Sequence, residues 1–294
     1  MKEKSIQVSV IIINYNTDEL TLAAVKSVFE FVSNVTFEII VVDNDSKETQ
    51  LAQLLFPYKN TYFYKLERNI GFGKANNFGF SKAEGEFIFL LNSDAYLIER
   101  NTLSTFMDYL NLHPDVACVG GNLVTADKKP NICHGKFLSV ERMLHDFGIK
   151  KVTPEYFNSN LATAQYCNVA IPTQVDHLTG AAIMIRRQII ERYGLFNPAY
   201  FMYLEDMELC YRYRKYGFLS IIMPDVKLVH LGGQSSIYDS EVNKRIVKEI
   251  AYSRYLFLQN VTSWPIAIAL YITGILLTFY KRVRNKIRKI VYAK

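Results

Sequence analysis

Three carboxylates, Glu205, Asp206 and Glu208, lie close together among aromatic and apolar residues in the second half of the chain. On a helix, Glu205 and Glu208 would share one face and Asp206 would point elsewhere. A carboxyl group in apolar surroundings has a raised pKa, which suits a general base. Acidic residues are also favoured at the N-terminus of any helix by its dipole. These residues alone therefore leave catalysis and a solvated helix end both open.

Polar residues follow three apolar segments in the first hundred positions. The segments 8–13, 37–42 and 87–91 are typical of strands buried on both faces, and helical patterns separate them. Strands alternating with helices predict a mostly parallel, doubly wound α/β sheet with helices on both faces. Ligands bind such sheets at the carboxyl ends of the strands. The polar residues expected there are Asn14, Asn16, Asp43, Asp45, Asn92, Ser93 and Asp94.

Asn92 and Asp94 stand two positions apart at one of these strand ends. Neighbouring oxygens of this kind suit Mg²⁺ or Mn²⁺, although an Asx turn would use the same residues. A single carboxylate binds such an ion weakly, so a metal would need diphosphate oxygens to complete its coordination. His230 ends another apolar segment before a Gly-Gly turn, where a histidine can be a ligand or a structural residue.

The loop 69–79 contains three glycines and leads into a helical pattern. It does not match a dinucleotide-binding motif, because Asn76 stands where GxGxxG needs a glycine. Its backbone N–H groups could meet a diphosphate, and a turn without a ligand is the alternative. The stretch 125–174 loses periodicity, so we expect an insertion with a short helix around 140–147.

Composition excludes several classes of protein. Half of the 294 residues are hydrophobic, which is enough for a sizeable core. Seven of the 34 Lys and Arg residues lie in 281–294, and the other 27 nearly balance the 28 Asp and Glu residues. A body this close to neutral predicts no nucleic-acid partner. Four separated cysteines argue against a zinc site, and the N-terminus lacks a signal-peptide pattern, so we expect a cytoplasmic protein.

The ordered motifs resemble the family 2 inverting glycosyltransferases, particularly the rhamnosyltransferase-like branch that builds bacterial surface polysaccharides. The similarity runs over residues 8–236. In chain order the matching residues are Asp43-Asn44-Asp45-Ser46, Asn69 with Gly71 and Asn77, Asn92-Ser93-Asp94, Gly180-Ala181, Glu205-Asp206, Arg212, and His230 with Gly232, Gly233 and Ser235.

The resemblance implies the GT-A fold, with a nucleotide-sugar half at 1–124 and an acceptor half at 125–240. It implies that Asp206 is the catalytic base and that Glu205 orients or contacts the acceptor. Asp94 and His230 would hold Mg²⁺ or Mn²⁺, and Asn92 replaces the first Asp of the family's DxD motif. The residues implied to bind the donor are Asn14, Asn16, Asp43, Asn69, Gly71, Asn77, Asn92, Ser93 and Arg212. The spacing of Glu208 and Arg212 also suits an ion pair.

The implied reaction moves a sugar, rhamnose first, from dTDP-rhamnose or a UDP-sugar to a lipid-linked or polysaccharide acceptor, with inversion. Two other functions stay open. A nucleotidyltransferase would need a basic, Gly-rich triphosphate loop near the first strand, where residues 14–18 contain neither Gly nor Lys. A membrane-bound glycan-binding protein with a degenerate site would not need the acidic residues that this chain keeps.

Residues 241–294 are expected to form a helical tail that associates with a membrane. The segment 264–280 carries no charge and would be about 25 Å long as a helix, shorter than the roughly 30 Å hydrocarbon core of a bilayer. The cations that follow favour the anionic cytoplasmic leaflet. We therefore expect 264–294 to lie in or re-enter the inner face of the cell membrane, and the interface of a homo-oligomer is the alternative.

Overall fold

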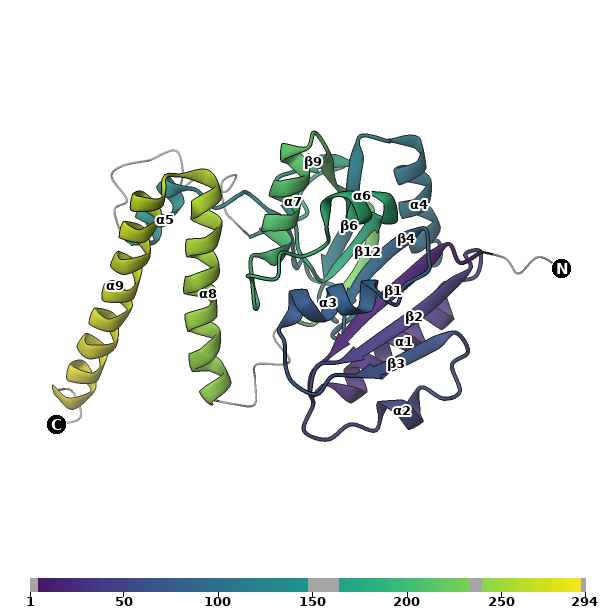
Figure 1. The fold of residues 1–294 in the computed structure, drawn as a ribbon, viewed down its shortest axis with the longest axis horizontal. Coiled ribbons are helices and arrows are strands. Elements are labelled where there is room, and N and C mark those ends of the chain that lie inside the picture. The colour runs from purple at the N-terminus through teal and green to yellow at the C-terminus, as the bar shows by residue number, and fades with distance from the viewer. Residues whose placement is uncertain (1–4, 148–163, 233–239, 292–294) are drawn as a thin grey trace. The chain divides into compact units, whose positions relative to one another are not determined.

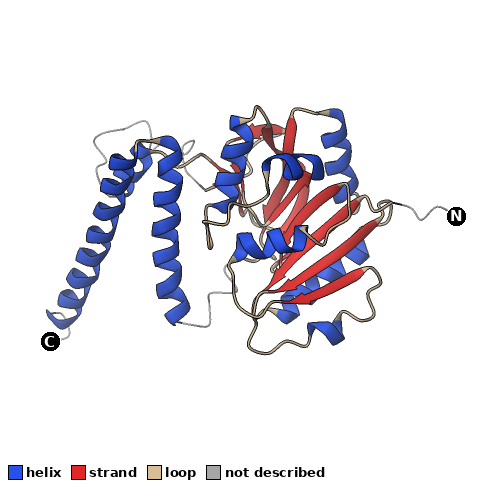
Figure 2. Ribbon diagram, in the orientation of Figure 1, coloured by secondary structure: helices blue, strands red, loops and turns tan. Residues whose placement is uncertain are grey.

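The computed structural model describes residues 5–147, 164–232 and 240–291, and within the last range it describes side chains for 248–277 and 280. The chain divides into two compact units. The first comprises Met1–Phe137 and Ala162–Ser240, and the second comprises Leu138–Leu161 and Glu241–Lys294. All strands in the described residues belong to the first unit, as the red arrows of Figure 2 illustrate.

The first unit is built on a sheet in the order β3-β2-β1-β4-β11-β6-β12-β5, with β9 also paired to β12. A smaller sheet has the order β10-β7-β8. The strands are β1 Val8–Asn14, β2 Phe37–Asp43, β3 Thr61–Lys65, β4 Phe87–Asn92, β5 Ala95–Leu97, β6 Val116–Val124, β7 Ile132–Gly135, β8 Gln165–Tyr166, β9 Thr173–Val175, β10 His177–Leu178, β11 Ala182–Arg186 and β12 Leu219–His230.

Strand β1 lies between β2 and β4 and runs parallel to both. All seven of its residues are buried, as its continuous apolar sequence predicts. Asn14 is paired with Asp43, and Ile13 is paired with Asn92. The three strands therefore end together, and their polar residues meet at one edge of the sheet.

Helices cover both faces of this parallel half, which confirms the α/β prediction. The helices of the first unit are α1 Asp18–Phe31, α2 Leu51–Leu54, α3 Phe72–Phe80, α4 Thr102–Leu112, α6 Arg187–Tyr193 and α7 Glu205–Lys215. Thr21 of α1 contacts the side chain of Asn14, whereas Gly79 of α3 packs against Ile11. Successive side chains of a strand point to opposite faces, so α1 and α3 lie on opposite sides of β1 (Figure 1).

The remaining part of the sheet is mixed. Strand β11 runs antiparallel between β4 and β6, and β5 and β9 run antiparallel to β12. Strands β7, β8 and β9 lie in the stretch 125–174, where no strand was expected, because two to four residues are too few to establish a period. Strand β12 is the longest strand in the described residues, because its pairing with β6 continues after a register shift between Met223 and Lys227.

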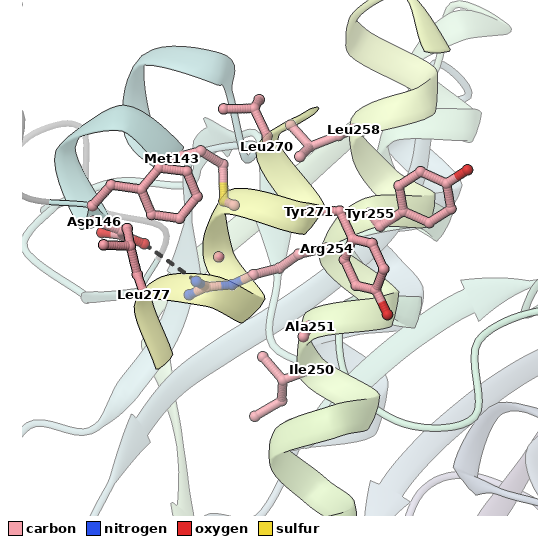
Figure 3. A pocket seen from close by; sticks show the side chains of 12 residues that line it. Met143, Asp146, Ile250, Ala251, Arg254, Tyr255, Leu258, Leu270, Tyr271 and Leu277 are labelled. Carbon is pink, nitrogen blue, oxygen red and sulfur yellow. Dashed lines mark ion pairs between the residues drawn. The ribbon is translucent and has the colours of Figure 1, made fainter. Parts of the chain in front are cut away.

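The second unit is helical in its described residues. It contains α5 (Val140–Asp146), α8 (Ser240–Val261) and α9 (Trp264–Val291). Phe257 and Leu258 of α8 and Ala267 of α9 are fully buried. A cavity of about 240 Å³ lies among the three helices, beside an ion pair between Arg254 and Asp146 (Figure 3). None of the described helices has the length and apolar character needed to cross a membrane.

Candidate active site

The ends of β1 and β2 are joined by a buried hydrogen-bond network. The amide Nδ2 of Asn14 donates to Oδ1 of Asp43 at 2.7 Å and to Ser46 Oγ at 3.1 Å. Asn14 Oδ1 accepts from the hydroxyl groups of Thr17 and Thr21. Asn14 and Asp43 are completely buried, so neither presents a free surface to a nucleotide. Both residues therefore join the ends of the two strands in this structure, and their contact with the donor stays a prediction.

Exposed polar groups at this edge come from the loops that follow the strands. Asn16 and Asp45 are exposed and adopt positive φ values of 56° and 71°. Asp45 Oδ2 accepts from the backbone N–H of Asn69 at 3.2 Å, and Asn44 Nδ2 donates to Asn69 Oδ1 at 3.1 Å. Asn44 and Asp45 are therefore candidate site residues, although the sequence analysis assigned neither of them to donor binding. Their position directly after Asp43 was the available signal.

Asp94 and His230 are brought together by the antiparallel pairing of β5 with β12, in which His230 is the partner of Ala95. Nε2 of His230 lies 3.4 Å from Oδ1 of Asp94. Asn92 Oδ1 and His230 Nδ1 are buried and have no hydrogen-bond partner. Unpaired buried polar atoms are rare in folded proteins, which marks this edge as a binding position. The hydroxyl oxygens of Ser93 and Thr17 lie 3.1 Å apart, within hydrogen-bond distance.

The segment entering β11 connects the Asn92–Asp94 motif to helix α7. The backbone N–H of Asn92 donates to the carbonyl of Ala181 at 2.9 Å. The N–H of Gly180 donates to Oδ2 of Asp206 at 2.8 Å. A side chain at Gly180 would lie 3.4 Å from Cβ of Asp206, so the chain passes close to this carboxylate. Residues 180 and 181 thereby place Asp206 near the strand-end motif.

Glu205 and Asp206 open α7 in different environments. Asp206 is half-buried, whereas Glu205 is buried and its Oε2 has no hydrogen-bond partner. Burial, and secondarily the charge of Asp206, raises the pKa of Glu205 to about 8. The two residues before the helix, Tyr203 and Leu204, have positive φ values of 68° and 62°. Non-glycine residues adopt this conformation at a cost, so the surrounding structure must hold the turn.

Arg212 forms the ion pair that its spacing from Glu208 predicted. Its Nε and Nη2 atoms donate to Glu208 at 2.9 and 3.1 Å. The guanidinium also donates to the carbonyl oxygens of Tyr193, Gly194 and Leu195. These five hydrogen bonds use all five of its N–H groups. The contacts therefore show a structural role for Arg212, and the donor binding expected for it stays a prediction.

Gly71 and Asn77 contact the segment that leads to α7. Asn77 forms two hydrogen bonds with the backbone of Phe196, and Gly71 lies against the carbonyl of Phe201. In this structure both residues therefore contact the backbone of the segment 196–201. The contacts described above make these residues the candidate site: Asn16, Asn44, Asp45, Asn69, Asn92, Asp94, Gly180, Glu205, Asp206 and His230.

The side chains around Asp94 suit a hard divalent cation that takes most of its coordinating oxygens from a bound nucleotide diphosphate and few from the protein. Asp94 offers a carboxylate, His230 an imidazole, and Asn92 an amide oxygen that is buried without a partner. No group of three or more His, Cys, Asp or Glu side chains is arranged as a metal cage in the described part of the chain. Such a set leaves coordination positions for diphosphate oxygens, which Mg²⁺ prefers.

A sheet edge with this arrangement agrees with the match to a family model. Residues 9–194 match the model of glycosyl transferase family 2. The chain belongs to that family. The family resemblance expected from the motifs is thereby confirmed, and the GT-A-like α/β fold agrees with it.

Two curated relatives act in transfer reactions. The chain is 25% identical over 216 residues to the low-salt glycan biosynthesis hexosyltransferase Agl10 of Haloferax volcanii. It is 26% identical over 229 residues to the dTDP-rhamnosyl transferase RfbF of Shigella flexneri. These alignments cover 70% and 76% of this chain. The chain spans 61% of the length of the first relative and 68% of the second.

A solved structure with a similar fold is GalNAc-T7 with UDP, GalNAc and Mn²⁺. The TM-score is 0.59 at 17% identity, and the similarity covers 84% of this chain and 48% of the other. At this identity the likeness concerns the fold alone.

Proposed function

We propose that this protein is a metal-dependent, inverting glycosyltransferase that moves a hexosyl group from a nucleotide diphosphate to a hydroxyl acceptor. The observation that supports the proposal is the pair of hydrogen bonds by which the adjacent residues Gly180 and Ala181 contact Asp206 and Asn92. A general base must lie near the position of the transferred sugar. The strand-end groups around Asp94 supply the place for the diphosphate of the donor.

Asp206 serves as the general base in this proposal. Its carboxylate removes the proton of the acceptor hydroxyl while that oxygen forms a bond to the anomeric carbon. The bond from the anomeric carbon to the diphosphate oxygen breaks on the opposite side, so the configuration inverts and the nucleoside diphosphate leaves with its electron pair. Mg²⁺ or Mn²⁺ would neutralise the charge that develops on the diphosphate. Asp94 and His230 would hold this ion, and Asn92 would contact the ion or the diphosphate.

The nucleotide is proposed to bind over the loops after β1 and β2, where Asn16 and Asp45 provide exposed polar groups and Asn69 is half-buried. Rhamnose from dTDP-rhamnose is the first candidate for the sugar, because RfbF is named as a dTDP-rhamnosyl transferase. A UDP-hexose is the second candidate. The acceptor is proposed to be a lipid-linked or polysaccharide glycan, since Agl10 is named for glycan biosynthesis.

Association with the inner face of the cell membrane is proposed through residues 264–294. Helix α9 exposes six large apolar or aromatic side chains in its first 17 residues: Trp264, Ile266, Ile272, Ile275, Leu276 and Tyr280. Seven Lys and Arg residues and no acid follow in 281–294. An apolar surface joined to a cationic segment suits an anionic lipid surface. The acceptor of a membrane-bound pathway would be presented at the same surface.

Incubation of the purified protein with Mn²⁺ and single nucleotide sugars tests the proposal. Release of nucleoside diphosphate is measured for dTDP-rhamnose and for UDP-hexoses, with and without a lipid-linked glycan acceptor. We expect release from one donor, stimulated by the acceptor and abolished by EDTA. A protein that binds a glycan yet releases no nucleotide from any donor would contradict the proposal.

A further inference from the structure

The loop 69–71 and helix α3 contact the two sides of the candidate active site. On the donor side, Ile70 N–H donates to Asn44 Oδ1 at 3.0 Å, in addition to the bonds between Asn69 and residues 44 and 45. On the other side, α3 contacts Phe196 and Phe201, which precede α7. A single short segment therefore joins the nucleotide loops to the chain that carries Asp206.

Asn77 makes the most specific of these contacts. Its Nδ2 donates to the carbonyl of Phe196 at 2.8 Å, and its Oδ1 accepts from the N–H of Phe196 at 2.9 Å. These two bonds engage both ends of the side-chain amide with one backbone residue. An aspartate of the same shape would lack the donor and would place an oxygen against the carbonyl of Phe196. The site thus requires an amide of this length.

Gly71 fixes the same segment five residues further on. The N–H of Phe72 donates to the carbonyl of Phe201 at 2.9 Å. Gly71 has a φ of 88°, and a Cβ at this position would lie 2.4 Å from the carbonyl oxygen of Phe201. A side chain at Gly71 would therefore strain its own backbone and displace Phe201.

The turn between Phe201 and Asp206 needs such anchors. Tyr203 and Leu204 are two successive non-glycine residues in the left-handed region, which costs roughly 1–2 kcal/mol for each residue. A strained conformation persists only where neighbouring contacts hold it. The contacts at Phe196 and Phe201 supply that restraint on one side, and the bond from Gly180 holds Asp206 on the other.

We infer that Asn77 is a positioning residue for Asp206 and does not bind the donor. It holds the segment 196–204, and this segment sets where the carboxylate of Asp206 stands relative to the sugar. The inference rests on the proposed function for its kinetic consequence alone. Its structural consequence, the restraint of 196–206, can be measured without any activity.

Hydrogen exchange tests the restraint directly. In Asn77→Ala and Asn77→Asp, amide exchange across 196–206 should become faster by about tenfold, because the segment opens more readily. Asn76→Ala is the matched control, since Asn76 is buried on the same helix and donates within it to Phe72. The control should leave exchange in 196–206 unchanged. Equal exchange in all four proteins would overturn the inference.

Kinetics then separates positioning from donor binding. We expect kcat for nucleotide release from dTDP-rhamnose, or from the UDP-hexose that the screen identifies, to fall by about 10–100-fold in both Asn77 variants. The Kd for the corresponding nucleoside diphosphate with Mn²⁺, measured by calorimetry, should stay within about twofold. A weakened Kd with an unchanged kcat would make Asn77 a donor ligand, and unchanged values of both would also refute the inference. Absence of turnover in the wild-type protein would instead contradict the proposed function.

Discussion

Gly180 donates its backbone N–H to the carboxylate of Asp206 across 2.8 Å, although 26 positions separate the two residues in the chain. The second oxygen of Asp206 accepts from the N–H of Met207 at 2.7 Å. Both hydrogen bonds orient the carboxylate, and Asp206 remains partly exposed to solvent. A base that is oriented and still accessible is the arrangement that proton removal from an incoming hydroxyl requires.

Asp206→Asn should abolish sugar transfer while keeping nucleotide binding. The amide oxygen can still accept one of the two backbone hydrogen bonds, from Gly180 or from Met207, but the side chain can no longer take a proton. We expect turnover to fall by about 10²–10⁴-fold. Turnover is measured as product formed from labelled donor, and nucleotide affinity by calorimetry. Wild-type turnover in this variant would assign the base to another residue.

Glu205→Gln should change how stability depends on pH. The pKa of Glu205 lies near 8 in the folded protein, above its ordinary value of 4.5, so the folded state retains a proton that the unfolded state has lost. The wild-type protein therefore loses stability as pH rises from about 4.5 to about 8, and this loss is absent below 4.5. Glu205→Gln does not ionise at this position, so its stability should fall less over this pH range.

Urea unfolding at several pH values measures this effect. The stability difference in favour of Glu205→Gln should grow with pH over the same range. A parallel series on Glu191→Gln, a surface carboxylate with a more exposed side chain, serves as the control. Identical pH profiles for the wild type and Glu205→Gln would show that Glu205 is ionised throughout.

Asp94→Asn should remove most of the metal dependence of nucleotide binding. The carboxylate of Asp94 is the charged oxygen ligand of the proposed site, and an amide binds Mn²⁺ more weakly. Titration of UDP or dTDP with and without Mn²⁺ should show a metal-dependent gain in affinity in the wild type that is lost in the variant. His230→Ala should reduce the gain to a smaller extent. An unchanged metal-dependent gain in nucleotide affinity in Asp94→Asn would show that the metal binds at another position.

Arg212→Lys should destabilise the protein by about 2–4 kcal/mol, because a lysine cannot replace the bidentate pair with Glu208 and the three carbonyl contacts. Urea unfolding measures the loss. The Kd for nucleotide should not change at temperatures where the variant is folded. A weaker nucleotide affinity without loss of stability would restore the donor-binding role expected from the sequence.

Replacement of Ile272 and Leu276 by Gln should weaken binding to vesicles of phosphatidylglycerol and phosphatidylcholine. Both side chains are exposed on α9 before the cationic segment. Phe56 and Leu112 in the other unit are more exposed, at 90% and 77%, so Phe56→Gln and Leu112→Gln are matched controls. Cosedimentation should fall in the α9 variant alone.

Two further results would decide between a membrane and a homo-oligomer interface. Truncation after Ser263 should abolish cosedimentation if α9 is the anchor. If the α9 variant keeps vesicle binding but changes its sedimentation coefficient, the helix forms an interface between copies of the chain.

Sequence reasoning succeeded where long, continuous apolar segments define strands. The segments at 8–13 and 37–42 lie in β1 and β2, and their common parallel direction placed Asn14 beside Asp43 as expected. The short strands β7, β8 and β9 escaped notice, because their stability comes from pairing partners distant in the sequence. Local patterns carry little information about such pairing.

The contacts within the candidate site could be predicted only in part. The family resemblance grouped Asp94, Asp206 and His230, and the structure brings Asp94 to His230. The sequence could not reveal that Arg212 uses every N–H within the protein, since its carbonyl partners belong to the last residue of α6 and the loop after it. Burial and pairing of polar groups depend on tertiary packing, which no single motif contains.

Strand β12 also determines when the site can form during synthesis. It is the last strand in the described chain, and it supplies His230 and pairs with both β5 and β6. A ribosome adds residues from the N-terminus, and domains generally fold as units. Until residue 230 has left the exit tunnel, β5 lacks its partner and Asp94 lacks its neighbouring imidazole. A nascent chain that already contains Asp43, Asp94 and Asp206 therefore cannot complete the proposed metal-binding edge, and premature termination before β12 leaves a sheet with an exposed strand.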